Sequence, residues 1–217
     1  MITRHRAADS MARHRHAEAY VAVVLAGDYV EAGDGGRVRA RPGTVIAHAP
    51  FSAHRDEFGA SGAAVLNLPG VEAVSGTGTI GDVDALVRAA ERDLREAVLL
   101  LGEQFRPHLS TPDDWPDQLA AALSADPDMA ISDWAERMGL AAASVSRGFA
   151  RAYGVSPKRF RLEARAQRAM RSLPAWHGTL AAFAADQGFA DQAHLARTVR
   201  AITGVAPRAL RAKSLQA

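Results

Sequence analysis

The sequence of 217 residues contains no cysteine. Disulfide bonds, thiolate metal ligands and cysteine nucleophiles are therefore excluded. No apolar run approaches the roughly 20 residues that a helix needs to cross a bilayer. The N-terminal stretch MITRHRAADS is basic and lacks the apolar segment of a secretory signal. We therefore expect a globular protein of the cytoplasm, and a hydrophobic content of 48% is sufficient for a substantial core.

Charge is distributed unevenly along the chain. Residues 129–217 contain 14 Lys or Arg against 5 Asp or Glu, whereas the first 128 residues contain 12 against 19. This segregation indicates two domains with different partners. The basic half favours a polyanion, and its many Arg side chains suit bidentate contacts with phosphate or guanine. An Arg-rich solvated surface would explain the Arg content but not the segregation.

The C-terminal half contains an internal duplication. GVSPKRFR at 154–161 is followed by GVAPRALR at 204–211, and the similarity extends upstream of both copies. Residues at corresponding positions match in four pairs, namely Ala135 and Ala184, Gly139 and Gly188, Arg147 and Arg197, and Gly154 and Gly204. A match of this extent indicates two copies of one structural unit.

Each copy predicts a helix, a tight glycine turn and a second helix. Apolar residues recur at helical spacing before Gly139 and Gly188, where we expect a left-handed cap. These residues are Ile131, Trp134, Ala135 and Met138 in the first copy and Leu180, Phe183 and Ala184 in the second. The second helices should bury Val145 with Phe149 and Leu195 with Val199. This is helix-turn-helix geometry, in which the second helix enters the major groove.

A helix over 157–173 is predicted between the two copies, starting at Pro157 and ending at Pro174. A continuous helix would hold the two units at a fixed separation. Presenting both recognition helices to one face of DNA requires about 34 Å between them.

Residues 116–211 resemble the DNA-binding domain of AraC-type transcriptional regulators. The resemblance rests on SRGFARAYGVSP, RLEARAQRA and AADQGFADQAHLARTVRAITGVAPRALR, in this order and spacing. It implies that each GVxP motif closes a recognition helix. The sequence departs from the family pattern at Ala141, where a capping Ser is usual, and its loss costs about 1 kcal/mol. DNA-alkyl repair, which occurs in some proteins with this domain, is excluded because the acceptor thiols are absent.

The resemblance also implies which side chains face DNA. From the first recognition helix they are Ala143, Ser144, Ser146, Arg147 and Arg151, and from the second Gln192, Ala193, His194, Arg197 and Arg200. Arg147 and Arg197 suit guanine, and Gln192 suits adenine. We expect Arg151, Arg200, Lys158 and Arg159 to contact phosphates. The alternative is that these Arg side chains form intramolecular salt bridges or are simply solvated.

The N-terminal half has period-two patterning with glycine and proline between the segments. Strands are predicted at 20–27, 36–50 and 62–69, with a turn at GDGG (33–36). The spacing of His14, His16, Tyr20 and Gly27, followed by Pro42-Gly43 and later by His48 and His54, resembles a small cupin barrel, the usual sensor of AraC-type regulators.

The histidines of this half are candidates for an effector pocket. On one strand, His14, His16 and Tyr20 would point to the same face, and the fold would bring His54 beside them. Three neutral imidazoles, from His14, His16 and His54, suit Zn, Ni, Fe or Mn. The alternative is that His14, His16, Tyr20 and His54 only line a pocket for an organic effector. Glu18 could supply a carboxylate after a register shift, whereas we expect His48 to pack at a strand end and His5 to be mobile.

Residues 80–106 predict one amphipathic helix of roughly seven turns. Its apolar face could cover the barrel, and the resemblance implies that it also joins two protomers. Residues 107–115 are rich in Pro and Asp and read as a linker.

The predicted fold class is α+β with two domains. A cupin-like β-barrel at 1–79 and the dimerisation helix at 80–106 precede an all-α domain at 116–217 with two helix-turn-helix units joined by a linker helix. The leading hypothesis is a non-enzymatic, homodimeric transcriptional regulator. Its partners would be promoter DNA, a small-molecule or metal effector and RNA polymerase, with no membrane. The alternatives are a metal-dependent cupin enzyme tethered to DNA and a non-specific nucleoid protein.

Overall fold

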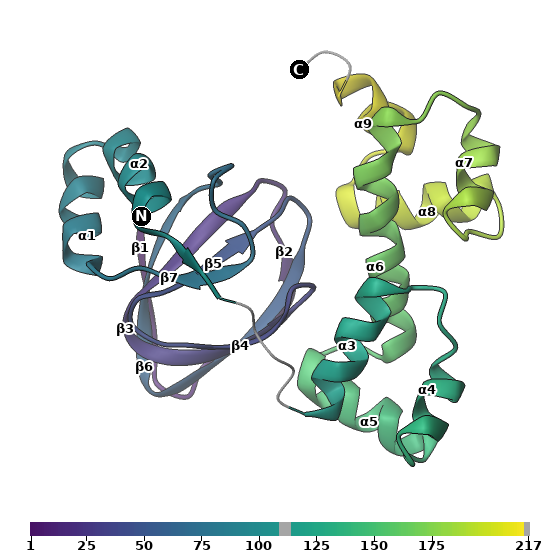
Figure 1. The fold of residues 1–217 in the computed structure, drawn as a ribbon, viewed down its shortest axis with the longest axis horizontal. Helices are drawn as coiled ribbons and strands as arrows, with labels where there is room; N and C mark the ends of the chain where they lie inside the picture. Colours follow the sequence, from purple (N-terminus) through teal and green to yellow (C-terminus); the bar gives the residue numbers. More distant parts are fainter. Residues whose placement is uncertain (109–113, 215–217) are drawn as a thin grey trace. The chain divides into compact units, whose positions relative to one another are not determined.

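A computed structural model describes residues 1–108 and 114–214, without the side chains of 211–214. The chain divides into two compact units, residues 1–113 and 114–217. The first is a β-sheet unit with two helices, and the second is helical (Figure 1). The α+β fold class predicted from the sequence is thus confirmed. Within the described ranges, no helix has the length and apolar character required to cross a membrane.

The N-terminal unit is built on one curved antiparallel sheet. Its main path has the strand order β1-β6-β3-β5-β7-β8, and β2 and β4 pair with β6 and β3. The strands are β1 (Ile2–His5), β2 (Ser10–Arg15), β3 (Tyr20–Gly33), β4 (Gly36–Ala40), β5 (Thr44–His48), β6 (Ala53–Pro69), β7 (Thr77–Thr79) and β8 (Arg106–Pro107). The predicted strand at 36–50 is therefore two strands, and the turn at 33–36 joins β3 to β4.

The side chains of β3 pack on both faces of the sheet. Val21 and Val23 belong to a core between the sheet and the helices, whereas Ala22 and Val24 belong to a second core that includes Tyr29 and other residues. The pairing with β6 shifts on both sides of Gly27, which has a φ of 72° and lies directly against the backbone of Gly62. After this bulge the interior-facing positions change from even to odd residue numbers, as β-bulges allow.

The prediction of one helix over 80–106 is wrong. Two helices, α1 (Val83–Arg92) and α2 (Leu94–Gln104), are separated by Asp93 in extended conformation (φ −154°, ψ 122°). The Asp93 carboxylate accepts a hydrogen bond from the Arg95 amide at 2.9 Å, which caps α2. The bend lets Leu86 of α1 and Leu101 of α2 enter the same core against the sheet. The apolar spacing continues through the bend, so periodicity did not reveal it.

The predicted linker at 107–115 is shorter at both ends. Pro107 pairs with Gly78 in the sheet, and α3 begins at Trp115. The remaining linker positions 109–113 lie outside the described residues.

The C-terminal unit consists of short helices arranged about a longer one (Figure 1). The 16-residue α6 (Pro157–Ser172) joins the two helical groups and is about 24 Å long. The other elements are α3 (Trp115–Ala125), α4 (Ile131–Arg137), α5 (Ala142–Tyr153), η1 (Leu173–Ala175), α7 (Leu180–Asp186), α8 (Gln192–Thr203) and α9 (Pro207–Ser214). Gly139 and Gly188 follow α4 and α7 with φ values of 65° and 71°, as expected for left-handed caps. Met138, which was expected in the core, is 40% exposed.

Candidate functional site

The two recognition helices, α5 and α8, are each held by one buried face. In α5 the buried residues are Val145, Phe149 and Tyr153, and in α8 they are Leu195, Thr198, Val199 and Ile202. Both helices end at a left-handed glycine, Gly154 or Gly204. The duplicated GVxP motif therefore closes a helix twice, as the sequence predicts.

The starts of the recognition helices differ. Asp191 accepts a hydrogen bond from the His194 amide at 2.6 Å, whereas Ala141 at the equivalent place in α5 makes no side-chain cap. Helix α8 thus has a capped first turn that α5 lacks.

The side chains predicted to face DNA lie on the exposed faces of these helices. Ala143, Ser144, Ser146, Arg147 and Arg151 are exposed in α5, and so are Gln192, Ala193, Arg197 and Arg200 in α8. His194 is half-buried, with its ring edge-on to Phe189 at a centroid distance of 5.3 Å. Among the described residues, neither Arg147 nor Arg197 forms an ion pair, so the salt-bridge alternative has no support there. Direct contact of these side chains with DNA stays a prediction.

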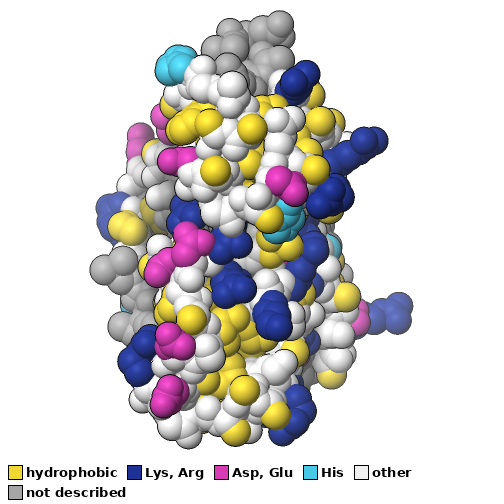
Figure 2. All heavy atoms as spheres, turned by 90° about the vertical axis from the view of Figure 1, so that its right-hand side faces the viewer, with side chains coloured by type: hydrophobic (Ala, Val, Ile, Leu, Met, Phe, Trp, Pro, Cys, Tyr) yellow, Lys and Arg dark blue, Asp and Glu magenta, His cyan; other side chains and the backbone are white. Residues whose placement is uncertain are grey.

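The Arg side chains of α6 serve structural contacts as well. Arg159 donates to Glu163 at 2.7 Å, and Arg165 and Arg168 pair with Asp128 at 2.6 and 3.2 Å. Arg159 is therefore engaged within the protein rather than only solvated, while Lys158 is exposed. Figure 2 shows one face of the helical unit, with Lys and Arg side chains spread across it and Asp and Glu mostly towards its left edge.

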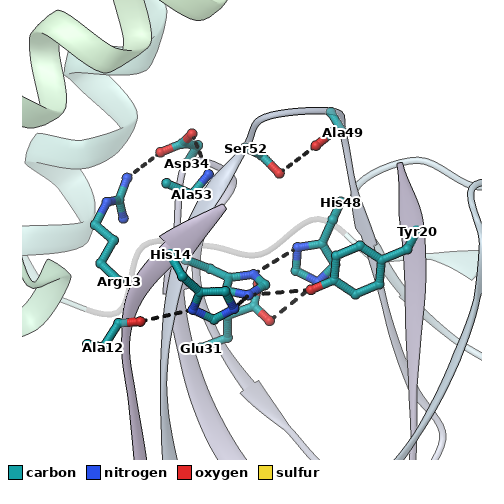
Figure 3. Close-up of polar contacts among 11 residues, drawn as sticks. Ala12, Arg13, His14, Tyr20, Glu31, Asp34, His48, Ala49, Ser52 and Ala53 are labelled. Atoms are coloured by element: carbon teal, nitrogen blue, oxygen red, sulfur yellow. Dashed lines mark hydrogen bonds and ion pairs between the residues drawn. The ribbon is translucent and has the colours of Figure 1, made fainter. Parts of the chain in front are cut away.

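A second candidate site lies inside the N-terminal sheet. The register pairs His14 of β2 with His54 of β6, and Tyr20 of β3 with His48 of β5. The ring of Tyr20 stacks on that of His48 at 4.3 Å, and His54 Nε2 lies 2.8 Å from His14 Nε2. Figure 3 shows His14, Tyr20, Glu31 and His48 directed towards one another.

The structure brings together the four predicted pocket residues His14, His16, Tyr20 and His54, but not from one strand. His14 is in β2, His16 follows that strand, and Tyr20 begins β3. Ring contacts connect His16 with His14 at 5.0 Å and with Tyr20 at 4.7 Å.

The expectations for Glu18 and His5 are wrong, whereas His48 packs at a strand end as expected. Glu18 is exposed, and the carboxylate nearest to the histidines is Glu31, with Oε1 at 3.7 Å from His54 Nδ1. His48 does end a strand, but it faces the cluster, with Nδ1 at 3.0 Å from His54 Nδ1. His5 lies in β1 and stacks on Phe58 at 4.1 Å. Glu31 could not be found from strand alternation, because the bulge at Gly27 changes which residues face inward.

Burial controls the charge of this cluster. Burial, assisted by neighbouring imidazoles, lowers the pKa of His48 to about 3 and that of His54 to about 2, so both rings are neutral at neutral pH. Burial raises the pKa of Glu31 well above its ordinary value, and the nearby Asp56 adds to the effect. Burial also raises the pKa of Asp56 to about 6, although His14 and Arg55 oppose the rise. Strongly perturbed groups of this kind cluster at functional sites.

The cluster lines a cavity of about 580 Å³, which falls within the range of small-molecule sites. The apolar lining includes Met11, Phe58, Val65 and Leu68. Two overlapping sets of side chains have metal-ligand spacing, namely His14, His16 and His54, and Glu31, His48 and His54. The first set is the one predicted from the sequence, and imidazole and carboxylate donors both suit divalent transition metals.

Comparison with known proteins gives matches to the helical unit and to complete chains. Residues 134–213 match the family model of a helix-turn-helix domain. A probable AraC family transcriptional regulator from Rhodopseudomonas palustris CGA009 is similar over 45% of this chain and 94% of its own, with 26% identity and a TM-score of 0.42. ToxT from Vibrio cholerae strain SCE256, solved with an unsaturated fatty acid, is similar over 97% of this chain and 94% of its own, with 9% identity and a TM-score of 0.44. No curated protein matches the sequence.

Two helix-turn-helix units on one connecting helix define a DNA-binding protein. The family match extends over both units, from 134 to 213, and includes the duplicated glycine caps and recognition helices. Residues 134–213 therefore form a helix-turn-helix DNA-binding domain of the AraC type, and they follow an N-terminal β-sheet unit in the chain.

Proposed function

We propose that the chain is a transcriptional regulator of the AraC family and that an effector bound in the N-terminal cavity controls its binding to promoter DNA. The supporting observation is the buried polar cluster of His48, His54, Glu31 and Asp56 in a cavity of the N-terminal unit. Burying two carboxyl groups and two imidazoles opposes folding unless a ligand or another function compensates. The effector would be a small molecule or a metal ion, and His14, His16, Tyr20 and His54 would line its pocket.

On DNA, the two recognition helices of one protomer would read successive major-groove faces. Because α5 and α8 expose different side chains, the half-site should be asymmetric. Arg147 would contact guanine in one part of it, and Gln192 and Arg197 would read the other. As a transcriptional regulator, the protein would also contact RNA polymerase at the promoter and be located in the cytoplasm.

A homodimer would be formed through the helices that cover the sheet. Leu99 of α2 is 70% exposed and Leu94 is 45% exposed, although neighbouring apolar residues of α2 are in the core. If these side chains pair two protomers, Leu99→Glu should convert the dimer to a monomer in light scattering coupled to size exclusion. A parent protein that is monomeric at all concentrations would contradict dimerisation.

The experiment for effector control starts with an operator selected in vitro from random DNA with the full chain. Its Kd is then measured by fluorescence anisotropy for chelator-treated protein, and again after addition of Zn²⁺, Ni²⁺ or Mn²⁺ or of small molecules that raise the Tm. We expect at least one of them to change the Kd tenfold or more.

Met11→Trp fills part of the cavity from β2 and provides the matched variant. It should keep the ligand-free Kd of the parent and lose the response. A ligand that binds and raises the Tm but leaves the Kd unchanged would contradict effector control.

A further inference from the structure

The ring of His54 belongs to two different groups of side chains. Its Nε2 atom lies 2.8 Å from His14 Nε2, whereas its Nδ1 atom lies 3.0 Å from His48 Nδ1 and 3.7 Å from Glu31 Oε1. The two candidate ligand sets therefore use opposite edges of one imidazole. A tautomer that favours one edge for metal binding disfavours the other.

The hydrogen bonds of His14, which lies on the Nε2 side of His54, determine the tautomer of His54. His14 Nδ1 lies 2.9 Å from the Ala12 carbonyl oxygen, which can only accept, so Nδ1 carries a proton. With that one proton on the ring, His14 Nε2 is an acceptor and His54 Nε2–H donates to it. His54 Nδ1 consequently carries a lone pair that points towards Glu31 and His48.

The inner set, Glu31, His48 and His54, is held more rigidly than the outer set, His14, His16 and His54. Glu31, His48 and His54 lie on β3, β5 and β6, which are neighbours in the sheet, and each is at most 7% exposed. In the outer set, His16 lies outside the strands and is exposed. Metal sites are most precise when their ligands are held on regular elements.

The distances and donor types of the inner set suit one metal ion. Ligand atoms at about 2.1 Å from an ion are about 3.0–3.4 Å apart in tetrahedral or octahedral geometry. The measured separations from His54 Nδ1 are 3.0 and 3.7 Å. With His48 Nδ1 as the ligand atom, the ring proton lies on His48 Nε2, which is buried without a hydrogen-bond partner among the described residues and lies 3.6 Å from Glu31 Oε2.

We propose that Glu31, His48 and His54 bind one divalent transition-metal ion, with His14 positioning His54 from behind rather than binding the ion. The carboxylate offsets part of the ion's charge, and two imidazoles with one carboxylate suit Zn²⁺, Co²⁺ or Ni²⁺, with further coordination positions facing the cavity. The proposed effector control would make such an ion the effector or its anchor. Metal binding itself does not depend on that control.

The test uses the untagged full chain after removal of metals with a chelator. Co²⁺ is added while its visible absorption is recorded, and Zn²⁺ competition gives the affinity. We expect one Co²⁺ per chain. Glu31→Gln and His48→Gln should raise the Kd at least 100-fold, whereas His16→Ala should change it less than threefold.

The surface variant His177→Ala controls for loss of any histidine, and circular dichroism verifies that each variant is folded. Loss of Co²⁺ binding in folded His16→Ala, with Glu31→Gln unaffected, would overturn the proposal and place the ion at the outer set. Absence of Co²⁺ and Zn²⁺ binding by the parent would overturn it altogether. If Co²⁺ binds as proposed but the operator Kd does not change, the metal site stands and the proposed effector control fails.

Discussion

Tyr153, at the end of recognition helix α5, donates a hydrogen bond of 2.8 Å to Asp117 Oδ1 of α3 in the interior of the DNA-binding unit. Tyr153 is fully buried and Asp117 is 7% exposed. The Tyr153 ring also stacks on Phe149 and meets Phe160 of α6 edge-on. One side chain thus connects the first recognition helix to α3 and α6.

Tyr153→Phe should lower the free energy of unfolding by about 1–3 kcal/mol, because a buried carboxylate loses a donor while the ring packing remains. Urea unfolding of Tyr153→Phe, of Asp117→Asn and of the double variant would measure the effect. The double variant should lose less than the sum of the two single losses, since the buried charge is gone. Equal stability of parent and Tyr153→Phe would show that this hydrogen bond is not important.

The unequal helix starts give a matched pair of variants. Ala141→Ser places a capping hydroxyl where the backbone already has the extended conformation of a cap (φ −68°, ψ 138°), and it should raise stability by about 0.5–1 kcal/mol. Asp191→Ala removes the existing cap of α8 and should lower stability by about 1 kcal/mol. Thermal unfolding distinguishes the two directions. A loss of stability in Ala141→Ser would mean that the first turn of α5 cannot accept a cap.

Arg197→Ala should lower operator affinity by about 1–3 kcal/mol and relax selectivity at one base pair. Lys158→Ala should weaken all sequences alike and reduce the salt dependence by about one charge, because phosphate contacts carry no sequence information. Competition binding with single-base operator variants at several salt concentrations provides the measurement. Arg95→Ala, an exposed position of the sheet unit, is the control for loss of charge. Unchanged affinity and base preference in Arg197→Ala would refute the assigned role of α8.

The buried cluster predicts opposing effects of pH on stability. Folded His48 and His54 have pKa values of about 3 and 2, far below the ordinary 6.5, so their contribution is lost as pH falls below 6.5, where the unfolded rings bind protons. Folded Asp56 has a raised pKa of about 6 and Glu31 is raised as well, so these groups favour the folded state as pH falls. The two effects offset each other in the parent protein.

Removal of a carboxyl group or of a histidine from the cluster should reveal the pH effect of the groups that remain. Asp56→Asn should lose stability between about pH 6.5 and 5, and His48→Gln should gain it, each by up to about 1 kcal/mol per pH unit relative to the parent. Urea unfolding without added metal, at several pH values, measures both slopes. Parallel curves for the two variants would contradict the assignment of these groups.

Local sequence signals were sufficient to predict the helix ends and most of the buried positions of the DNA-binding unit. Gly139 and Gly188 end their helices in the left-handed region because a side chain there is strained, and this preference requires no tertiary contact. The burial of Phe149 and Val199 follows from spacing along a single helix. Met138 is the exception, because its place at the end of the helix exposes it despite the correct spacing.

The cluster in the sheet required information from distant parts of the chain. His14 and His54 are 40 residues apart and meet through strand pairing, which the cupin resemblance anticipated. Glu31 and His48 were missed because their orientation depends on the bulge at Gly27 and on the register between β3 and β5. The bend at Asp93 was missed for a similar reason, since packing of both helices on one sheet face compensates for the broken helix.

The sequence alone therefore determined the duplicated helix-turn-helix units, their caps and the side chains available to DNA. Those features depend on residues within a few positions of each other, where backbone preference and helical periodicity decide. Tertiary structure decided which side chains surround the cavity and which edge of His54 carries its lone pair. Strand register and the irregular pairing around Gly27 change the face to which the following side chains point, and neither is encoded in any short stretch of the chain.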